Sequence, residues 1–231
     1  ELAIETPYTI ALNDEAIGSS MVLPVGLEAF GVGFLFGQGY IKSAEEVKEV
    51  IVCPDGRIAV YADVTSEQPK EVIITSGCGG TGKISREMLE GAFDPLQEYT
   101  ISFPEVAQFI RQALQKSPLG PRTHCVHGCG LWQDGKLVLF YEDVGRHNAV
   151  DKVLGSILLG HASPKAAIYT TGRLTSDMVL KCARMGIPII MSRTSPSSLG
   201  LAIARRAGAT LAAYARPERL NIFNAPERII L

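Results

Sequence analysis

The second half of the sequence predicts an α/β fold built on a parallel sheet that helices cover on both faces. Short apolar strand candidates alternate there with helix candidates of about ten residues, which is typical of strand–helix–strand crossovers. In addition, Gly186 and Gly208 each end a helix candidate shortly before the next strand. The expected strands are 137–141, 166–169, 187–191 and 210–214, and the expected helices are 148–159, 176–185 and 199–207.

The first half of the sequence predicts a more mixed arrangement. The expected elements, in chain order, are a strand at 8–12, a helix at 27–36, a strand pair at 45–52 and 57–64, a strand at 72–74, and helices at 85–91 and 103–116. Gly37 and Gly39 end the first helix, and Pro54-Asp55-Gly56 supplies the turn of the strand pair. We therefore divide the chain into a small N-terminal α+β domain (1–75), a glycine-rich loop (76–83) and an α/β domain that holds the ligand (84–231).

Composition and charge exclude several classes of protein. With 46% hydrophobic and 20% charged residues among 231, the chain can build a core and is not disordered as a whole. Its net charge of -2, from 22 basic and 24 acidic side chains, argues against a nucleic-acid partner. No apolar run approaches the roughly 18 residues of a membrane span, so no membrane partner is expected. Five cysteines, an odd number, indicate a reducing compartment, which we expect to be the cytoplasm.

The glycine-rich run TSGCGGTGK, from Thr75 to Lys83, contains the candidate catalytic residue, Cys78. Glycines flank this cysteine, so its thiol is sterically open and mobile. Lys83 and the free backbone N–H groups of the loop favour the thiolate, which is the nucleophilic form. These properties suit a cysteine that carries sulfur from a donor to an acceptor. The alternative is a flexible connection that contains an inert cysteine.

The same run nearly matches a nucleotide-binding P-loop. Gly77, Gly82 and Lys83 are in register with that pattern, and the run lies between a strand candidate and a helix candidate. The match fails at Ile84, where a hydroxyl group should hold Mg²⁺. A P-loop nucleotidase is therefore the least favoured alternative.

Polar residues gather where expected strands end and helices begin, which is the edge at which parallel sheets bind ligands. Arg146 at a helix N-terminus suits a phosphate, and Asp143 is positioned to order Arg146 or His147. The next strand ends in a loop with hydroxyl groups and a second arginine. We predict a polyphosphate cleft at this edge, with a capped helix that bears surface charges as the alternative. Its expected ligand-binding residues are Arg146, His147, Thr171, Gly172 and Arg173.

Several long runs of the sequence, taken together, carry a family resemblance. They are EDVGRHNAVDKVLG from Glu142, TTGRLTSDMVLKCARMGIPIIMSRTSPSSLGLAIARRAG from Thr170, and YARPERLNIF from Tyr214. These runs resemble FdhD, the formate dehydrogenase accessory sulfurtransferase family. The run SGCGGTGK and the stretch LEAFGVGFLFGQGYI from Leu27 are similar to it as well. The likeness covers nearly the whole chain in order, and EDVGRHNAVDK is long and specific.

The resemblance implies both a fold and a function. Family members have a cytidine-deaminase-like, three-layer α/β/α main domain with a smaller N-terminal domain, and they tend to form homodimers. They take sulfur from a cysteine desulfurase as a persulfide. They pass it to the molybdenum or tungsten cofactor before this enters formate dehydrogenase. The cofactor carries two pterin–guanine-dinucleotide arms, so guanine nucleotides are expected to mimic it.

The resemblance also implies roles for individual residues. The persulfide cysteine of the family falls on Cys78, which agrees with the properties of the loop. The C-terminal cofactor-binding segment of the family falls on six consecutive residues: Tyr214, Ala215, Arg216, Pro217, Glu218 and Arg219. No resident metal site is expected.

One departure from the family lies in the loop. Many members have C-x-x-C there, whereas the second cysteine position is Thr81 in this chain. A dithiol shuttle within the loop is therefore unavailable, although a single persulfide on Cys78 needs only one sulfur nucleophile. This departure keeps open an alternative of another class, a chaperone that binds and delivers the cofactor without carrying sulfur.

The second departure is the stretch HCVHGC at 124–129, where the family has small residues. Two histidines and two cysteines suggest zinc, yet structural zinc sites draw their ligands from separated pairs. On a strand, Cys125, His127 and Cys129 would share one face. We favour a buried or cleft-lining strand. Metal binding, or Cys125 or Cys129 as the missing partner thiol, are the alternatives, and His127 and His147 are candidates for proton transfer.

Overall fold

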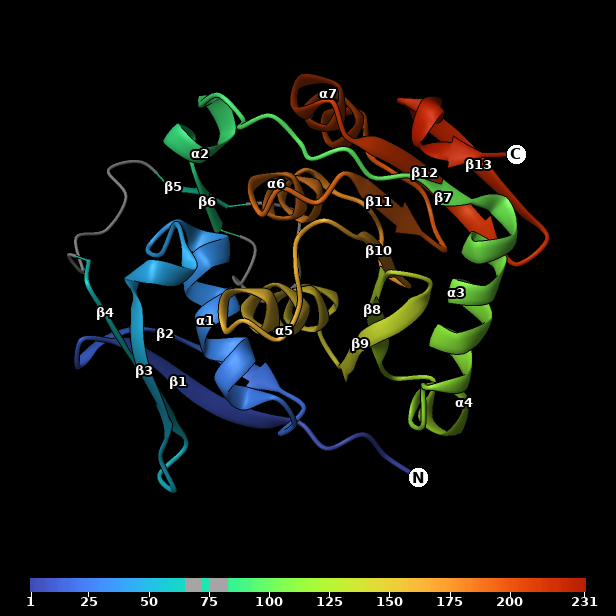
Figure 1. The fold of residues 1–231 in the computed structure, drawn as a ribbon. Helices are drawn as coiled ribbons and strands as arrows, with labels where there is room; N and C mark the ends of the chain where they lie inside the picture. Colours follow the sequence, from blue (N-terminus) through green and yellow to red (C-terminus); the bar gives the residue numbers. More distant parts are fainter. Residues whose placement is uncertain (65–71, 75–82) are drawn as a thin grey trace.

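The fold is built on two principal β-sheets with helices between and around them, as the computed structural model in Figure 1 shows. The structure describes residues 1–64, 72–74 and 83–231. The first sheet has the strand order β2-β1-β4-β3, and the second has the order β13-β12-β11-β10-β8-β9. The candidate catalytic residue Cys78 lies outside the described residues, as does most of the predicted loop 76–83.

The N-terminal sheet begins with a tight hairpin. Its strands are β1 (Thr6–Leu12), β2 (Glu15–Val22), β3 (Val47–Val52) and β4 (Arg57–Ala62). Asn13 and Asp14 connect β1 to β2 with φ angles of 47° and 70°, the left-handed pair that a two-residue hairpin turn requires. The sequence did not predict β2, because glycine and serine at 18–20 interrupt its apolar alternation. The other three strands lie where they were expected.

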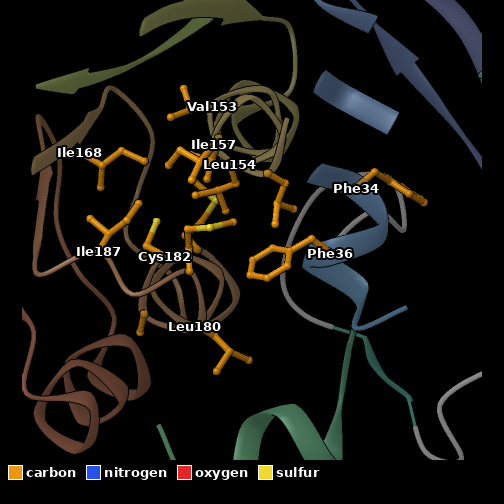
Figure 2. Packing of buried hydrophobic residues seen from close by; sticks show 14 of the residues in the cluster. Phe34, Phe36, Val153, Leu154, Ile157, Ile168, Leu180, Cys182 and Ile187 are labelled. Atoms are coloured by element: carbon orange, nitrogen blue, oxygen red, sulfur yellow. The ribbon is translucent and has the colours of Figure 1, made fainter. Parts of the chain in front are cut away.

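Helix α1 (Leu27–Gln38) joins this sheet to the rest of the molecule by crossing α5 (Arg146–Leu158). A Cβ atom on Gly33 would lie 1.8 Å from a backbone oxygen of α5, and one on Gly155 would lie 1.8 Å from a backbone oxygen of α1. The two helices approach this closely only because both positions are glycine. Figure 2 shows Phe36 of α1 pointing toward side chains of α5, α6 and the second sheet, so one core runs through both parts of the molecule.

The second sheet is mixed rather than wholly parallel. Its strands are β8 (His127–Gln133), β9 (Lys136–Asp143), β10 (Ala167–Thr170), β11 (Ile189–Ser192), β12 (Thr210–Arg216) and β13 (Arg219–Asn224). β10, β11 and β12 are parallel neighbours, as the crossover rhythm predicts. β8 runs antiparallel between β9 and β10, and β13 runs antiparallel beside β12. The expectation of a parallel sheet is therefore wrong at both ends, where hairpins rather than crossovers add the outer strands.

Helices cover both faces of this sheet. On one face lie α5, α6 (Ser176–Arg184) and α7 (Ser198–Ala207), whose apolar side chains share a core cluster with those of the strands. On the other face lies α3 (Phe103–Gln115), with a second cluster that includes Phe109 and Trp132 (Figure 1). The predicted three-layer α/β/α architecture is confirmed.

The smaller elements connect these layers. They are β5 (Val72–Ile74), β6 (Lys83–Ser85), α2 (Arg86–Glu90), β7 (Ile101–Ser102), α4 (Gly120–Thr123) and β14 (Ile229–Ile230). The predicted helices agree with α2 and α3, whereas α4 was not predicted. α5 begins at Arg146, two residues earlier than the predicted range 148–159. Arg146 and His147 therefore belong to its first turn.

None of the described helices is long and apolar enough to cross a membrane. The domain boundaries after residues 75 and 83 stay a prediction.

Candidate functional site

Five chain segments meet at one edge of the second sheet. Because β9 is antiparallel to β8 and β8 is antiparallel to β10, the strands β9, β10, β11 and β12 all point the same way. Their carboxyl ends lie at this edge together with the amino end of β8, where His127 faces Asp143 in the register. Polar loops at the carboxyl ends of neighbouring strands are where α/β proteins bind ligands. The candidate site therefore lies at this edge of the second sheet.

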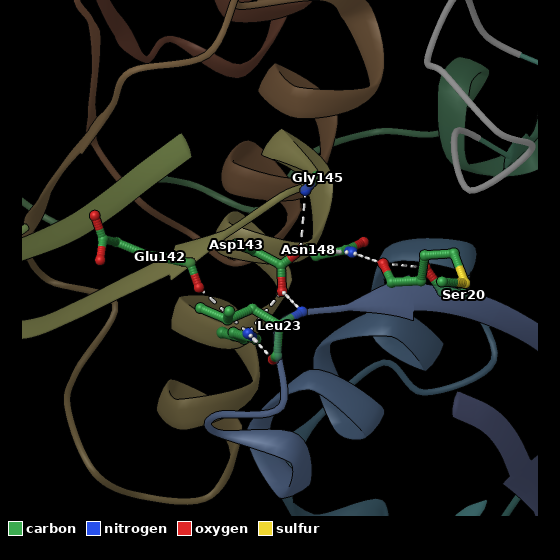
Figure 3. A network of polar contacts seen from close by, with 8 residues as sticks. Ser20, Leu23, Glu142, Asp143, Gly145 and Asn148 are labelled. Atoms are coloured by element: carbon green, nitrogen blue, oxygen red, sulfur yellow. Dashed lines mark hydrogen bonds and ion pairs between the residues drawn. The ribbon is translucent and has the colours of Figure 1, made fainter. Parts of the chain in front are cut away.

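Asp143 fixes the junction between β9 and α5 (Figure 3). Its Oδ1 accepts hydrogen bonds from the backbone N–H of Gly145 and from Asn148 Nδ2, both at 2.9 Å. Its Oδ2 accepts one from the backbone N–H of Leu23 at 3.1 Å and lies 2.6 Å from Lys152 Nζ. Asp143 thus holds the start of α5 and the chain that precedes α1. The hypothesis that it orders Arg146 or His147 is wrong, because its acceptor positions are occupied by these other groups.

Arg146 is a buried cation in the first turn of α5. Its side chain is only 8% exposed, and neither Nε nor Nη2 finds a hydrogen-bond acceptor among the described residues. The aliphatic part of the side chain lies against Gly172, where a Cβ atom would come within 2.8 Å of the Arg146 Cβ. Buried guanidinium groups are normally paired, because leaving charged donors unsatisfied costs free energy. The position at the N-terminus of α5 adds the positive end of the helix dipole, so the arrangement suits an anion.

His127 and Thr171 lie beside this arginine. Thr171 Oγ1 accepts a hydrogen bond from the backbone N–H of Gly128 at 3.0 Å and lies 3.3 Å from His127 Nδ1. Burial lowers the pKa of His127, and the positive charges of Arg146, His147 and Arg173 lower it further. His127 is therefore a neutral imidazole at neutral pH, in a group of positively charged neighbours.

His147 is held by a carboxylate that the sequence analysis did not single out. Its Nε2 forms a buried contact with Asp177 Oδ2, and Thr175 donates a hydrogen bond of 2.5 Å to Asp177 Oδ1. Burial alone would raise the pKa of Asp177, but the contacts with His147 and Thr175 outweigh it and lower the pKa. In the sequence, Thr175 stands two residues before Asp177 at the start of a helix candidate. This pattern could have identified Asp177 as a buried, hydrogen-bonded carboxylate. A role in proton transfer for His147 stays a prediction.

The predicted cofactor-binding residues fall into two groups. Arg146, His147, Thr171, Gly172 and Arg173 lie together around the start of α5. The second group begins at Tyr214, whose N–H donates to the Thr194 carbonyl at 3.0 Å, and Arg216 Nη1 donates to the Arg193 carbonyl at 2.7 Å. The loop that carries Arg193 connects the groups, since Ser192 Oγ donates to the Gly172 carbonyl at 2.6 Å.

The remaining predicted residues lie further along the second group. Ala215 is buried in the cluster on the α3 face. Pro217 and Glu218 form the turn between β12 and β13, and Arg219 is the partner of Arg216 across that hairpin. No hydrogen bond or ion pair within the described part of the chain joins these three turn residues to Arg146.

The cysteines that the structure describes divide by burial. Cys129 and Cys182 are buried in the core, where burial raises the pKa of both thiols, that of Cys182 to about 12. Neither is suited to react as a thiolate, so Cys129 does not fit the alternative of a partner thiol. Cys125 is exposed.

The stretch HCVHGC is only partly a strand. β8 begins at His127, and the residues before it lie outside the sheet, with His124 ending α4 in a left-handed conformation. Cys125 therefore does not share a strand face with His127 and Cys129, which both lie on β8. Within 1–64, 72–74 and 83–231, no cluster of three or more metal-ligating side chains is present.

The P-loop alternative does not fit the described backbone. Lys83, Ile84 and Ser85 form strand β6, which pairs antiparallel with β5. A P-loop lysine instead starts a helix, whose N-terminus faces the phosphates. The Ser85 hydroxyl accepts a hydrogen bond from the Met88 N–H at 3.0 Å and so caps α2. It is not free for Mg²⁺.

A cavity of about 500 Å³ lies elsewhere, between α1, β3 and the C-terminal end of α5. None of the predicted site residues that the structure describes lines it. The unpaired buried groups at the sheet edge are the stronger indication of a ligand, because they report missing partners rather than empty space.

Comparisons with known proteins agree with the motifs of the sequence. A sequence profile of the FdhD/NarQ family matches residues 3–230. The sulfur carrier protein FdhD of Wolinella succinogenes is 34% identical, over 98% of this chain and 82% of its own length. The protein of the same name from Sulfolobus acidocaldarius is 32% identical, over 100% of this chain and 91% of its own length.

A solved structure is similar as well. It is the crystal structure of a protein assigned as a formate dehydrogenase accessory protein from Desulfotalea psychrophila. It shares 70% identity with this chain, with a TM-score of 0.91, and the match covers 99% of this chain and 91% of that one. The likeness therefore includes both sheets and the polar edge of the second.

Proposed function

The chain belongs to the FdhD/NarQ family, and from this membership we propose that it is a sulfur carrier for the maturation of a formate dehydrogenase. In this proposal Cys78 accepts sulfur as a persulfide from a cysteine desulfurase. The sulfur then passes to a molybdenum cofactor with two guanine-dinucleotide arms, which the protein binds as a substrate. The protein acts in the cytoplasm as a homodimer.

The accepting step needs one nucleophilic sulfur. The Cys78 thiolate attacks the terminal sulfur of the desulfurase persulfide, a new S–S bond forms, and the donor cysteine leaves as a thiolate. Thr81 stands where many relatives have a second cysteine, so the persulfide is not converted to a disulfide within the loop. Cys129 and Cys182 are buried and their thiols are poorly acidic, so they are unsuited to accept the sulfur. The other thiols that could accept it are Cys78, the exposed Cys125 and the half-exposed Cys53.

The observation that carries the binding half of the proposal is the buried guanidinium of Arg146, whose Nε and Nη2 have no acceptor among the described residues. A phosphate oxygen would supply the acceptor that its Nε and Nη2 lack, and charge-assisted bonds of this kind are stronger than neutral ones. Arg173 is exposed on the adjacent loop, and the Thr171 hydroxyl lies beside His127. These groups suit the diphosphate of a guanine nucleotide, so GDP is a practical probe for the substrate.

The carrier step is tested by labelling the protein with sulfur. The wild type, Cys78→Ala and Cys125→Ala are each incubated with a cysteine desulfurase and L-cysteine, and the intact masses are measured. We expect the wild type and Cys125→Ala to gain about 32 Da, the mass of one sulfur atom, and Cys78→Ala to gain nothing. Equal labelling of Cys78→Ala and the wild type would contradict the proposal.

The second candidate is a chaperone that binds the cofactor without carrying sulfur. The substitution of Thr81 for the second loop cysteine favours it, since a dithiol mechanism is lost. It predicts wild-type affinity for GDP together with no sulfur adduct on any cysteine. The same mass measurement, combined with a GDP titration, separates the two functions.

A further inference from the structure

A second unpaired polar group lies at the same sheet edge, on the opposite face from α5. Tyr169 on β10 is only 1% exposed, and its hydroxyl has no hydrogen-bond partner among the residues that the structure describes. Buried hydroxyl groups are nearly always satisfied, so an orphan calls for an explanation. Replacing the hydroxyl with hydrogen would remove this defect without changing the shape of the ring.

The ring and the hydroxyl of Tyr169 have different surroundings. The ring packs in the cluster beneath α3, edge-on to Phe109 with 5.9 Å between ring centroids. The phenol lies within electrostatic reach of two arginines, Arg193 from the loop after β11 and Arg216 from the end of β12. The apolar part of the side chain thus serves the core, while its polar end faces positive charge.

The backbone is shaped to bring these two arginines together. The register between β12 and β13 shifts between Ala213 and Arg216, and Tyr214 within this bulge has a φ of 53°. Bulges redirect side chains and are common beside functional sites. Here the bulge allows Arg216 to donate its 2.7 Å hydrogen bond to the Arg193 carbonyl, so the guanidinium of Arg216 is held near the phenol.

The three groups share one chemical requirement. Burial raises the pKa of Tyr169, and although the two arginines oppose this effect, the phenol stays protonated at neutral pH. A protonated phenol and two guanidinium groups all offer N–H or O–H donors. The partner that can satisfy them together is an anion with several acceptor oxygens. Arg193 is exposed and Arg216 is half-buried, so such an anion can approach through the guanidinium groups.

We propose that Tyr169, Arg193 and Arg216 form a second anion subsite, which binds a phosphoryl group of a nucleotide on the α3 side of the sheet. This subsite is distinct from the one around Arg146, which lies on the α5 side. The proposal rests on the proposed function, because a substrate with two diphosphate arms supplies a phosphoryl group for each subsite. Tyr169 and Arg193 are then binding residues in addition to the segment from Tyr214 to Arg219.

The test removes the Tyr169 hydroxyl alone. GDP, inorganic diphosphate and guanosine are titrated into the wild type and Tyr169→Phe by calorimetry at fixed salt. We expect Tyr169→Phe to bind GDP and diphosphate about tenfold more weakly, the typical effect of losing one hydrogen bond to a charged group. We expect the affinity for guanosine to be unchanged and the ligand-free variant to unfold at no lower urea concentration than the wild type.

Tyr99→Phe is the matched control, because it deletes the same atom from a tyrosine on the same face of the sheet. The Tyr99 hydroxyl donates to the Trp132 carbonyl at 3.2 Å, so its loss should lower stability and leave the affinity for GDP unchanged. Wild-type affinity of Tyr169→Phe for GDP and diphosphate overturns the proposal. So does an equal loss in both variants, a matching loss for guanosine, or a wild-type protein that binds neither GDP nor diphosphate.

The sulfur-carrier function is separable from this outcome. Sulfur labelling of Cys78 by a desulfurase does not require the subsite, so Tyr169→Phe should gain the same persulfide adduct as the wild type. If the affinities contradict the subsite while labelling persists, the proposal fails and the carrier function stands.

Discussion

Helix α5 buries two cations whose surroundings are opposite. Lys152 is fully buried, and its Nζ lies 2.6 Å from Asp143 Oδ2, 2.9 Å from the Leu23 carbonyl and 3.3 Å from the Glu142 carbonyl. Arg146, less than two turns earlier, is nearly as buried, yet two of its nitrogens have no partner among the described residues. The described residues supply the Lys152 ammonium with three acceptors and leave Nε and Nη2 of Arg146 with none. The difference teaches that the first cation serves the structure, whereas for the second we propose a ligand as the missing partner.

The same contrast between buried polar groups with and without partners recurs elsewhere in the molecule. Lys181 on α6 is paired with Asp151 on α5 at 2.8 Å, and both side chains are buried. Tyr99 has an acceptor for its hydroxyl, whereas Tyr169 has none in the described part of the chain. Satisfied groups lie between elements that pack together. Among the described residues, unsatisfied atoms of Arg146 and Tyr169 lie at the edge where loops of the second sheet meet, whereas those of Arg57, Trp132 and Arg184 lie elsewhere.

The largest expected effect comes from breaking a satisfied pair. Asp143→Asn keeps the shape of the side chain but leaves the Lys152 ammonium buried without its counter-charge. We expect the free energy of unfolding to fall by about 3–5 kcal/mol, as is typical when one partner of a buried ion pair is removed. Urea unfolding followed by circular dichroism measures this change.

An exposed ion pair provides the control for that experiment. Lys48 and Asp63 lie 3.6 Å apart, but both side chains are largely exposed. Asp63→Asn should leave the urea midpoint within experimental error, because exposed pairs contribute little. If Asp143→Asn is no more harmful than Asp63→Asn, the Lys152 pair does not serve the structure and the comparison fails.

Removing the Arg146 cation should weaken ligand binding and leave the stability of the protein largely unchanged. Arg146→Met keeps much of the aliphatic side chain and deletes the charge. We expect the free energy of unfolding to stay within about 1 kcal/mol of the wild type or to rise, since Nε and Nη2 of Arg146 donate no hydrogen bond to any described residue. We expect the affinity for GDP to fall at least about tenfold. Calorimetric titration and urea unfolding of the same preparations test both parts.

Arg206→Met is the matched control for this prediction. Arg206 donates hydrogen bonds to the carbonyls of Leu89, Glu90 and Gly91 at 2.7, 3.0 and 3.1 Å, so its loss should reduce stability and leave GDP binding unchanged. A large loss of stability in Arg146→Met with unchanged binding would show that Arg146 is a structural residue after all.

The smallest expected effect is a pH dependence that arises from His127. Its pKa is lowered from the ordinary 6.5 by burial and by neighbouring positive charge, so the unfolded chain binds the proton more readily than the folded chain. Stability therefore falls as the pH drops below 6.5. A bound anion favours the protonated imidazole, so GDP binding should take up a proton and tighten by about two- to threefold as the pH falls.

His127→Asn identifies this contribution to the pH dependence. Titrations of the wild type and the variant at matched pH values cancel the protonation of GDP itself, which is common to both. The difference between their affinities should grow as the pH falls through the titration range of the histidine. A difference that does not change with pH would mean that His127 does not titrate beside the ligand.

Much of the fold could be predicted from the sequence, because local patterns carry it. The apolar run at 187–191 and the glycines after α6 and α7 place those elements to within about two residues. The strand β2 was missed because its pattern is interrupted, and its pairing depends on the turn at Asn13 and Asp14. The mixed sheet was missed because a hairpin such as β8–β9 adds an antiparallel strand without changing the crossover rhythm.

The residues of the candidate site also divide into those that the sequence predicted and those that it did not. The sequence predicted Arg146, Thr171, Gly172 and Arg173, because each lies in a loop between a predicted strand and the helix that follows it. It did not predict Asp177, Arg193 or Tyr169, since their roles depend on partners from other segments. Cys78 was predicted from its glycine neighbours and from the family resemblance, and its place in the fold lies outside the described residues.

The sequence by itself determined the α/β class, the family, the candidate sulfur nucleophile and the strand ends at which a ligand is expected. Periodicity and motifs report the neighbours of a residue along the chain, and these features depend on such neighbours. Only the tertiary structure decided which buried polar groups are satisfied. Hydrogen-bond partners come from segments far apart in the chain. Leu23 and Asp143 satisfy Lys152, whereas donors of Arg146 and Tyr169 find no acceptor within the described residues.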